Sequence, residues 1–329
     1  MSEVRVDPVC GRRIILAAER LARPNDFLGL HTQARNFCPF CRGNEDSTPR
    51  SLYAFNDASG KWLIRVVPNK FPAFSRDCPE GRLTGGLYES YGGYGMHEVV
   101  IETPDHSGRF ETLPEWHAAE IIRTYAGRAR FLLAQKGIEF VMTFRNYGCN
   151  AGASLSHPHS QIVAMTQLPM RVRQEMDGAA SYFSKTGRCV FCDMAKTELS
   201  EGKRLVAENA AFAAFTPYAS RFSFELCLVP KMHASRFEDI SASDAALLAA
   251  LLQDILRKLY YSLDGVSYNM VIHTLPRSRG GEASYHWHME IFPKITKAAG
   301  FEWGTGVYIN TVSPERAAGI LRTGQRFSI

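Results

Sequence analysis

The sequence predicts an α+β fold built as a tandem duplication of one unit. Three landmarks recur in the same order in both halves: a Cys-x-x-Cys pair, a His-x-x-Arg-Phe-Glu segment and a His-x-His triplet. In the first half they begin at Cys38, His106 and His157, and in the second at Cys189, His233 and His286. The last two landmarks are 51 residues apart in the first half and 53 in the second. Ordered matches at such similar spacing indicate an internal duplication.

Each half also combines short apolar strands with one long helix. In the first half, Pro114 is expected to start an amphipathic helix that Gly137 closes. In the second, Ser241 or Ser243 is expected to cap a helix that runs to about Leu263. The units are predicted to span residues 1–170 and 171–329. The glycine- and tyrosine-rich segment 81–95 predicts a mobile surface loop.

Composition narrows the class of function. A hydrophobic content of 45% with 22% charged residues is ordinary for a globular protein. The sequence contains no run of 18 apolar residues, so no membrane span is predicted. The N-terminus has no apolar segment of the signal-peptide kind, so a cytoplasmic protein is expected. The net charge of +5 is modest and scattered, which favours anionic small molecules over nucleic acid.

The stretch Ser154 to Ile162 carries the strongest chemical signal. Alternate side chains of an extended segment share one face, so His157, His159 and Gln161 form a stripe of imidazole, imidazole and amide.

The cysteine pairs predict two structural zinc sites. Two thiolates and two imidazoles from each half suit tetrahedral zinc and leave no open position. The first set is Cys38, Cys41, His106 and His157, and the second is Cys189, Cys192, His233 and His286. The main competing ligands are His97, His288 and Glu175. The other interpretations are cysteine pairs that are only buried or redox-active, and iron in place of zinc.

The chain resembles the galactose-1-phosphate uridylyltransferase family of the histidine-triad superfamily over nearly its whole length. The motifs that carry the resemblance are Asp7-Pro8-x-x-Gly11-Arg12, Arg20-x-x-Arg23-Pro24, Cys38-Pro39-Phe40-Cys41, Asn69-Lys70-Phe71-Pro72-Ala73, Pro104-Asp105-His106-Ser107, His157-Pro158-His159-Ser160-Gln161 and His286-Trp287-His288. The second half, with its cysteine pair and the segment from Gly300 to Asn310, resembles the plant ADP-glucose phosphorylases more. The resemblance implies two histidine-triad-like repeats, each an antiparallel sheet with a helix against it.

The resemblance also assigns roles. It implies that His159 is a nucleophile forming a nucleotidyl-enzyme intermediate with ping-pong kinetics, whose other ring nitrogen donates to a backbone carbonyl. His157 on zinc would hold the segment in place. Gln161 can hold a phosphoryl oxygen but cannot act as a general acid, which favours a transferase over a hydrolase.

The substrate contacts are expected from several loops. Arg20 and Arg23 match phosphate-contacting positions, Asn69 and Asn146 match nucleotide-contacting ones, and the turn holding Gly152 and Ser154 can cradle oxygens. Glu302, with Tyr308 or Gln325, is expected to reach the sugar hydroxyls. In the family the residues that contact the sugar come from the partner subunit, which implies a homodimer. The second repeat has Glu290 where the first has Gln161 and is expected to be catalytically degenerate.

Three functions remain open on the sequence. The first is transfer of a nucleoside monophosphate between a nucleotide sugar and a hexose 1-phosphate, best named as a UDP-glucose–hexose-1-phosphate uridylyltransferase. The second is an ADP-glucose or dinucleotide phosphorylase that uses inorganic phosphate as acceptor. The third is a zinc-stabilised binding module without catalysis.

Overall fold

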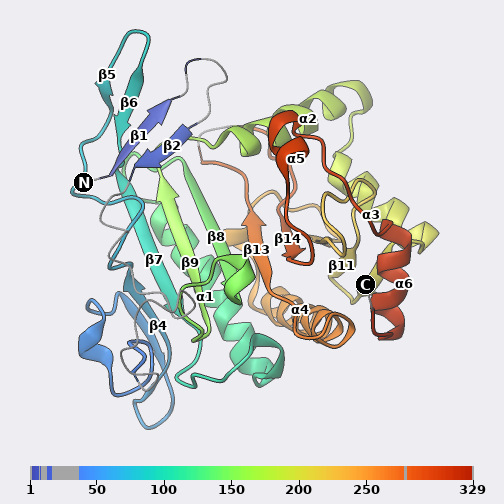
Figure 1. Ribbon diagram of the computed structural model, residues 1–329, viewed down its shortest axis with the longest axis horizontal. Coiled ribbons are helices and arrows are strands. Elements are labelled where there is room, and N and C mark those ends of the chain that lie inside the picture. Colours follow the sequence, from blue (N-terminus) through green and yellow to red (C-terminus); the bar gives the residue numbers. More distant parts are fainter. Residues whose placement is uncertain (1, 7, 9–12, 17–36, 278–279, 328–329) are drawn as a thin grey trace.

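A computed structural model describes residues 2–6, 8, 13–16, 37–277 and 280–327 of the chain. A ten-stranded antiparallel sheet forms its centre, in the order β10-β11-β12-β14-β13-β8-β9-β7-β4-β3 (Figure 1). These strands are β3 (Tyr53–Asn56), β4 (Trp62–Pro68), β7 (Gly95–Ile101), β8 (Phe140–Tyr147), β9 (His159–Met165), β10 (Leu205–Glu208), β11 (Phe212–Phe215), β12 (Leu226–Pro230), β13 (Tyr268–His273) and β14 (His288–Pro293). The predicted α+β class is confirmed.

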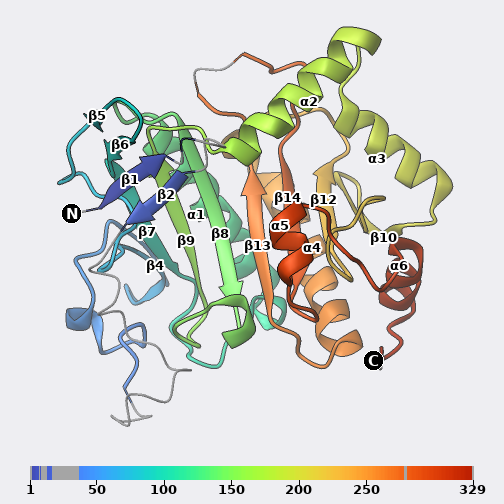
Figure 2. The ribbon, with the colours of Figure 1, turned by 45° about the horizontal axis from the view of Figure 1, so that its top comes forward.

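The two repeats share this one sheet. The next-to-last strand of each half lies at its middle, where β8 pairs with β13 from Thr143↔Ile272 to Tyr147↔Tyr268. The long helices α1 (Glu115–Leu133) and α4 (Ala242–Ser262) pack side by side against the same face (Figures 1 and 2). The division at residues 170 and 171 stays a prediction about units of sequence, because in space the halves form a continuous sheet and core.

Successive side chains of β9 point to opposite faces of the sheet, which places its apolar residues in the core and its polar residues on the other face. Ile162 and Ala164 are completely buried in the cluster beneath α1, whereas His159 and Gln161 face the other side of the sheet. A shift of one residue in register would exchange these two faces, so burial of the apolar set fixes which side the polar residues occupy.

The helix ends follow the sequence signals. Pro114 is the N-cap of α1, and the Ser241 side chain accepts a hydrogen bond from the Asp244 N–H at the start of α4. Sequence reasoning missed α2 (Met170–Thr186) and α3 (Val190–Glu201), each of which buries only two of its residues. The remaining helices are α5 (Gly300–Thr305) and α6 (Pro314–Thr323).

The expectation of a mobile loop over residues 81–95 is wrong in part. The segment contains β5 (Arg82–Thr84) and β6 (Glu89–Gly92), which form a four-stranded sheet with β1 (Glu3–Val6) and β2 (Arg13–Leu16). A Cβ on Gly92 would lie 1.8 Å from the Pro79 carbonyl oxygen. Glycine at this position permits a close approach of two backbones. In the sequence, a glycine of this kind cannot be distinguished from one in a loop.

A buried polar network lies between α1 and the sheet. Glu102, completely buried after β7, pairs with Arg145 of β8 and accepts hydrogen bonds from Tyr125 (2.7 Å) and Ser160 (2.5 Å). Burial by itself lowers the pKa of Arg145, but the neighbouring Glu102 carboxylate outweighs it and holds that pKa above its usual value. Ser160 therefore points into the core, away from the face that carries His159.

We expect Glu102→Gln to destabilise the fold by about 3–5 kcal/mol, because it leaves the Arg145 cation buried without its counter-charge. The free energy of unfolding from chemical denaturation measures this. Glu89→Gln breaks the exposed pair with Arg82, whose side chains are 48% and 38% exposed, and should cost less than about 1 kcal/mol. Equal losses in the two variants would contradict the argument.

No helix within the described residues combines the length and the apolar character needed to cross a bilayer.

Candidate functional site

The His159 ring is fixed by its own strand. Its Nδ1 lies 2.8 Å from the carbonyl oxygen of His157, and because a carbonyl can only accept, Nδ1 carries the proton. The lone pair of the neutral ring is then on Nε2. The expected hydrogen bond to a backbone carbonyl is confirmed. The ring is 6% exposed and packs edge-on against Phe40, with ring centroids 5.4 Å apart.

The four ligands predicted for the first metal site are brought together. In a zinc tetrahedron, Zn–S of about 2.3 Å and Zn–N of about 2.0 Å place sulfur and nitrogen about 3.5 Å apart. The Cys41 Sγ lies 3.5 Å from His106 Nδ1 and 3.6 Å from His157 Nδ1, and all four donors, including Cys38, lie within 4.8 Å of one another. The set thus fits zinc.

The second set has the same geometry. Cys192 Sγ lies 3.3 Å from His233 Nδ1 and 3.4 Å from His286 Nδ1, and Cys189 completes the group. Outer hydrogen bonds orient the rings, as in His157 Nε2 to the Thr103 carbonyl (2.8 Å) and His233 Nε2 to the Glu282 carbonyl (2.6 Å).

Burial raises the pKa of the Cys38 thiol to about 11, and burial with the adjacent Cys189 raises that of Cys192 to about 11. These pockets therefore favour neutral thiols until a cation balances the charge of a thiolate, which couples metal binding to the release of protons.

Gln161 is held by two residues from neighbouring loops and strands. Its Oε1 lies 3.0 Å from His97 Nε2 on β7 and 3.4 Å from Asn69 Nδ2, just beyond β4. The interpretation of His97 as a competing zinc ligand is not supported, since it belongs to none of the metal-ligand groups among the described residues. Its place next to Gln161 was missed, because only the pairing of β7 with β9 brings the two together.

The loop before His159 is anchored to the second repeat. The Asn269 side chain of β13 donates to Asn146 Oδ1 and to the Ala151 carbonyl, both at 2.8 Å. Gly152 follows with a left-handed φ of 77°, a conformation that favours glycine, and Ser154 is buried. Asn269 is a second residue that sequence reasoning missed, since it lies in the other half of the chain.

The other predicted substrate contacts are Glu302, in the second repeat, and two arginines near the N-terminus. Glu302 lies on α5, over the second repeat, where its carboxylate accepts a hydrogen bond from the Ala299 N–H at 3.0 Å (Figure 2). Arg20 and Arg23 lie outside the described residues. The roles of Asn69, Asn146, Gly152, Ser154 and Glu302 in substrate binding stay predictions.

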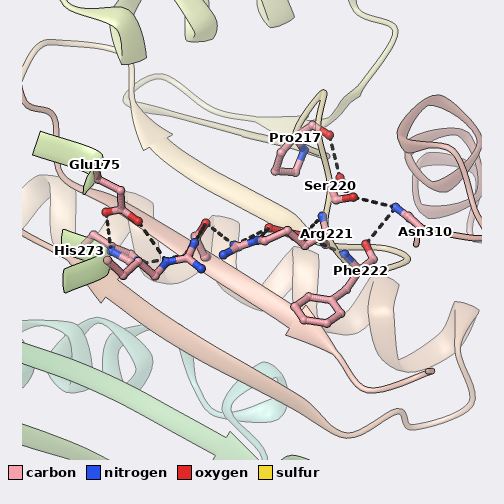
Figure 3. Close-up of polar contacts among 10 residues, drawn as sticks. Glu175, Pro217, Ser220, Arg221, Phe222, His273 and Asn310 are labelled. Atoms are coloured by element: carbon pink, nitrogen blue, oxygen red, sulfur yellow. Dashed lines mark hydrogen bonds and ion pairs between the residues drawn. The ribbon is translucent and has the colours of Figure 1, made fainter. Parts of the chain in front are cut away.

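The second repeat replaces this site with a network of ion pairs. His288 Nδ1 donates to the His286 carbonyl at 3.1 Å, as His159 does to His157. Glu290, at the position of Gln161, contacts His273 at 3.0 Å and Arg221 at 2.6 Å. Figure 3 shows the line of polar contacts from Glu175 and His273 to Arg221 and Asn310.

The charges of this network agree with the expectation that the second repeat is catalytically degenerate, which stays a prediction. Burial would raise the pKa of Glu290, but hydrogen bonding to His273 and nearby cations lower it to about 2. Burial would lower the pKa of His273, but hydrogen bonds to Glu175 and Glu290 raise it to about 9. The His273 ring lies 3.1 Å from the Glu175 carboxylate and 3.0 Å from that of Glu290, so ion pairs account for the group of Glu175, His273 and His288 without a metal.

We expect a maximum in the contribution of this network to stability between about pH 4.5 and 6.5. The His273 part is fully present below its ordinary pKa of 6.5 and is lost as the pH rises through about 9. The Glu290 part is present above 4.5 and is lost as the pH falls through about 2. Unfolding free energies between pH 6 and 10 should fall more steeply for the native chain than for His273→Gln; parallel curves would contradict this assignment.

Comparison with known proteins agrees with this geometry. The family model "Galactose-1-phosphate uridyl transferase, N-terminal domain" matches residues 2–169, and a model described as a domain of unknown function (DUF4921) matches residues 104–322. The chain is 34% identical to ADP-glucose phosphorylase of Arabidopsis thaliana over 97% of this chain and 92% of the relative. It is 27% identical to galactose-1-phosphate uridylyltransferase of Thermotoga maritima over 98% of both.

Solved structures of a phosphorylase and of a uridylyltransferase also match the chain. The crystal structure of an Arabidopsis thaliana ADP-glucose phosphorylase with bound ADP-glucose matches with a TM-score of 0.78 at 33% identity, covering 100% of both chains. A structure of a uridylyltransferase matches with a TM-score of 0.82 at 30% identity, covering 98% of both. The relatives that the chain matches are nucleotidyl-transferring enzymes. The chain belongs to the galactose-1-phosphate uridylyltransferase family.

Proposed function

We propose that this enzyme transfers a nucleoside monophosphate between a nucleotide sugar and a phosphate acceptor through a covalent nucleotidyl-His159. The observation that carries the proposal is the hydrogen bond from His159 Nδ1 to the His157 carbonyl. In the neutral ring this bond places the proton on Nδ1 and the lone pair on Nε2, which is the form of imidazole that attacks phosphorus.

In the first step, His159 Nε2 forms a bond to the α-phosphorus of the nucleotide sugar. The bond from that phosphorus to the bridging oxygen breaks, and hexose 1-phosphate leaves with the bonding electrons. A phosphate leaves without needing a proton, so an amide at position 161 is sufficient to hold the phosphoryl oxygen. In the second step the acceptor phosphate attacks the same phosphorus from the solvent side, and His159 leaves as neutral imidazole.

We further propose zinc in both Cys2His2 sites, in a structural role. The donor spacings fit tetrahedral zinc at each site, and all four positions are filled by protein. At the first site His157 is both a ligand and the residue whose carbonyl orients His159, so the bound metal would fix the segment that carries the nucleophile.

Two versions of the reaction differ in the base and the acceptor. Uridylyl transfer to a hexose 1-phosphate agrees with the matched family model. Phosphorolysis of ADP-glucose is favoured by the 34% identity to the Arabidopsis thaliana phosphorylase over nearly the whole chain. The chemistry at His159 is the same in both, and the difference lies in the pocket for the base and in the acceptor.

Intact-mass spectrometry of the enzyme mixed with UDP-glucose or ADP-glucose, without an acceptor, tests the proposal. An adduct of UMP or AMP mass, discharged by adding galactose 1-phosphate or inorganic phosphate, would identify the base and the acceptor together. An unmodified mass with both nucleotide sugars would overturn the covalent mechanism.

A homodimer with shared sites is also proposed. The segment 301–309, which includes most of α5, exposes several large apolar side chains, with Trp303 79% and Ile309 62% exposed. Glu302 lies in the same segment. A second copy would cover this surface and bring Glu302 to the partner's His159. Light scattering should give twice the mass of 36.8 kDa, and a monomer at working concentration would contradict this.

A further inference from the structure

Two neighbouring side chains fix the orientation of the Gln161 carboxamide. A carboxamide can present either its oxygen, which accepts, or its NH2 group, which donates, and the two choices have opposite effects on a bound phosphate. Gln161 is 3% exposed, and its Oε1 is directed at His97 Nε2 (3.0 Å) and Asn69 Nδ2 (3.4 Å). This orientation follows from the protonation of His97 and the direction of Asn69.

The protonation of His97 is set by a backbone group. The Ala73 N–H lies 3.1 Å from His97 Nδ1, and because a backbone N–H can only donate, Nδ1 must be the unprotonated nitrogen. The neutral ring then carries its proton on Nε2, which donates to Gln161 Oε1. The Asn69 Nδ2 lies 3.2 Å from this nitrogen as a second donor directed at the same oxygen. His97 is 5% exposed, so its ring is held within this contact.

Asn69 is oriented in the same way. Its Oδ1 accepts a hydrogen bond from the Phe71 N–H at 2.9 Å, so its Nδ2 is turned toward Gln161 as a donor. Two backbone N–H groups of one short loop, those of Phe71 and Ala73, therefore make both neighbours of Gln161 into donors. With its oxygen held by them, the planar carboxamide directs its NH2 group to the opposite side.

We propose that His97 is a positioning residue that acts through Gln161, by holding the carboxamide with its NH2 group toward the phosphoryl oxygen of the substrate. This rests on the proposed function, in which Gln161 contacts the transferred group. The physical reason is that a flipped amide would direct its oxygen at an anionic oxygen and turn a stabilising contact into a repulsive one.

The second repeat shows a side chain at the same position that offers no donor. There the residue at the position of Gln161 is Glu290, whose oxygens contact the cations of His273 and Arg221. An acceptor-only side chain held by cations offers no donor to a phosphate. The first repeat differs by combining an amide with two uncharged donors, which is the arrangement that leaves a donor for the substrate.

A double-mutant cycle tests the proposal. His97→Leu removes the donor, His97→Gln keeps an acceptor and a donor, and each is made in the native chain and with Gln161→Ala. The readout is the single-turnover rate of nucleotidyl-enzyme formation at saturating nucleotide sugar, with the dissociation constant of the sugar nucleotide measured separately. Melting temperature and zinc content show whether each variant is folded.

The expected result is a pattern of non-additivity. In the native chain His97→Leu should slow the step by about 10- to 100-fold, less than the 10²–10³-fold loss of a whole oxyanion donor, with little change in affinity. His97→Gln should restore most of the rate. With Gln161→Ala, His97→Leu should have less than about a twofold effect, because the residue through which it acts is absent.

Two outcomes would overturn the inference. An unchanged rate in folded His97→Leu would show that the amide needs no such support. An equal loss with and without Gln161 would show that His97 acts by another route, such as general packing. Failure of the native enzyme to form any adduct is a distinct result, because it overturns the proposed covalent function before His97 is considered.

Discussion

His159→Gln is expected to lower turnover by about 10⁴- to 10⁶-fold and to abolish the nucleotidyl-enzyme adduct, as removal of a covalent nucleophile does in other enzymes. Glutamine fills a similar volume but cannot attack phosphorus at neutral pH. Steady-state rates and intact mass after incubation with nucleotide sugar measure the two effects.

The duplication supplies a matched control for this variant. His288 begins β14 as His159 begins β9, and its Nδ1 makes the same hydrogen bond to the carbonyl two residues before it. Because His288 is accompanied by Glu290 rather than an amide, His288→Gln should leave adduct formation within about threefold of the native enzyme when normalised to folded protein. Adduct formation that survives His159→Gln but not His288→Gln would reverse the assignment of the two repeats.

Loss of the first metal is expected to have the second largest effect. Cys41→Ser should reduce the zinc content from about two ions per chain to about one and lower activity about 100-fold or more, because the His157 carbonyl that orients His159 loses its support. Elemental analysis by mass spectrometry and kcat measure these changes.

Cys192→Ser is the matched variant in the second repeat. It should also lose about one zinc and lower the melting temperature, with a much smaller effect on kcat per folded chain. A native zinc content near one would refute the second site. Equal losses of kcat in the two variants would show that the metals act on stability alone and not on the position of the nucleophile.

Much of this site could be predicted from the sequence. The repeated landmarks gave the duplication, and residue chemistry gave both ligand sets, since cysteines and histidines in the same order suit one kind of metal. The hydrogen bond of His159 was expected from the family resemblance. In each case the interaction is local or is dictated by residue type, so it needs no knowledge of how distant strands pair.

The missed features depend on contacts between distant segments. The helices α2 and α3 were not predicted, and each buries only two of its residues, so neither supplies a long apolar face to the core. The hairpin within residues 81–95 forms against β1, far away in sequence, and its glycine marks a close approach of backbones rather than mobility.

The sequence by itself determined which chemical groups are available: a pair of histidines with an amide beside them and two sets of potential metal ligands. Only the tertiary structure decided how those groups are oriented. The pairing of β7 with β9 places His97 against Gln161, and β13 brings Asn269 to the loop before the nucleophile. The reason is that a donor or acceptor acquires its role from its partner, and here the partners lie on strands that meet only in the folded sheet.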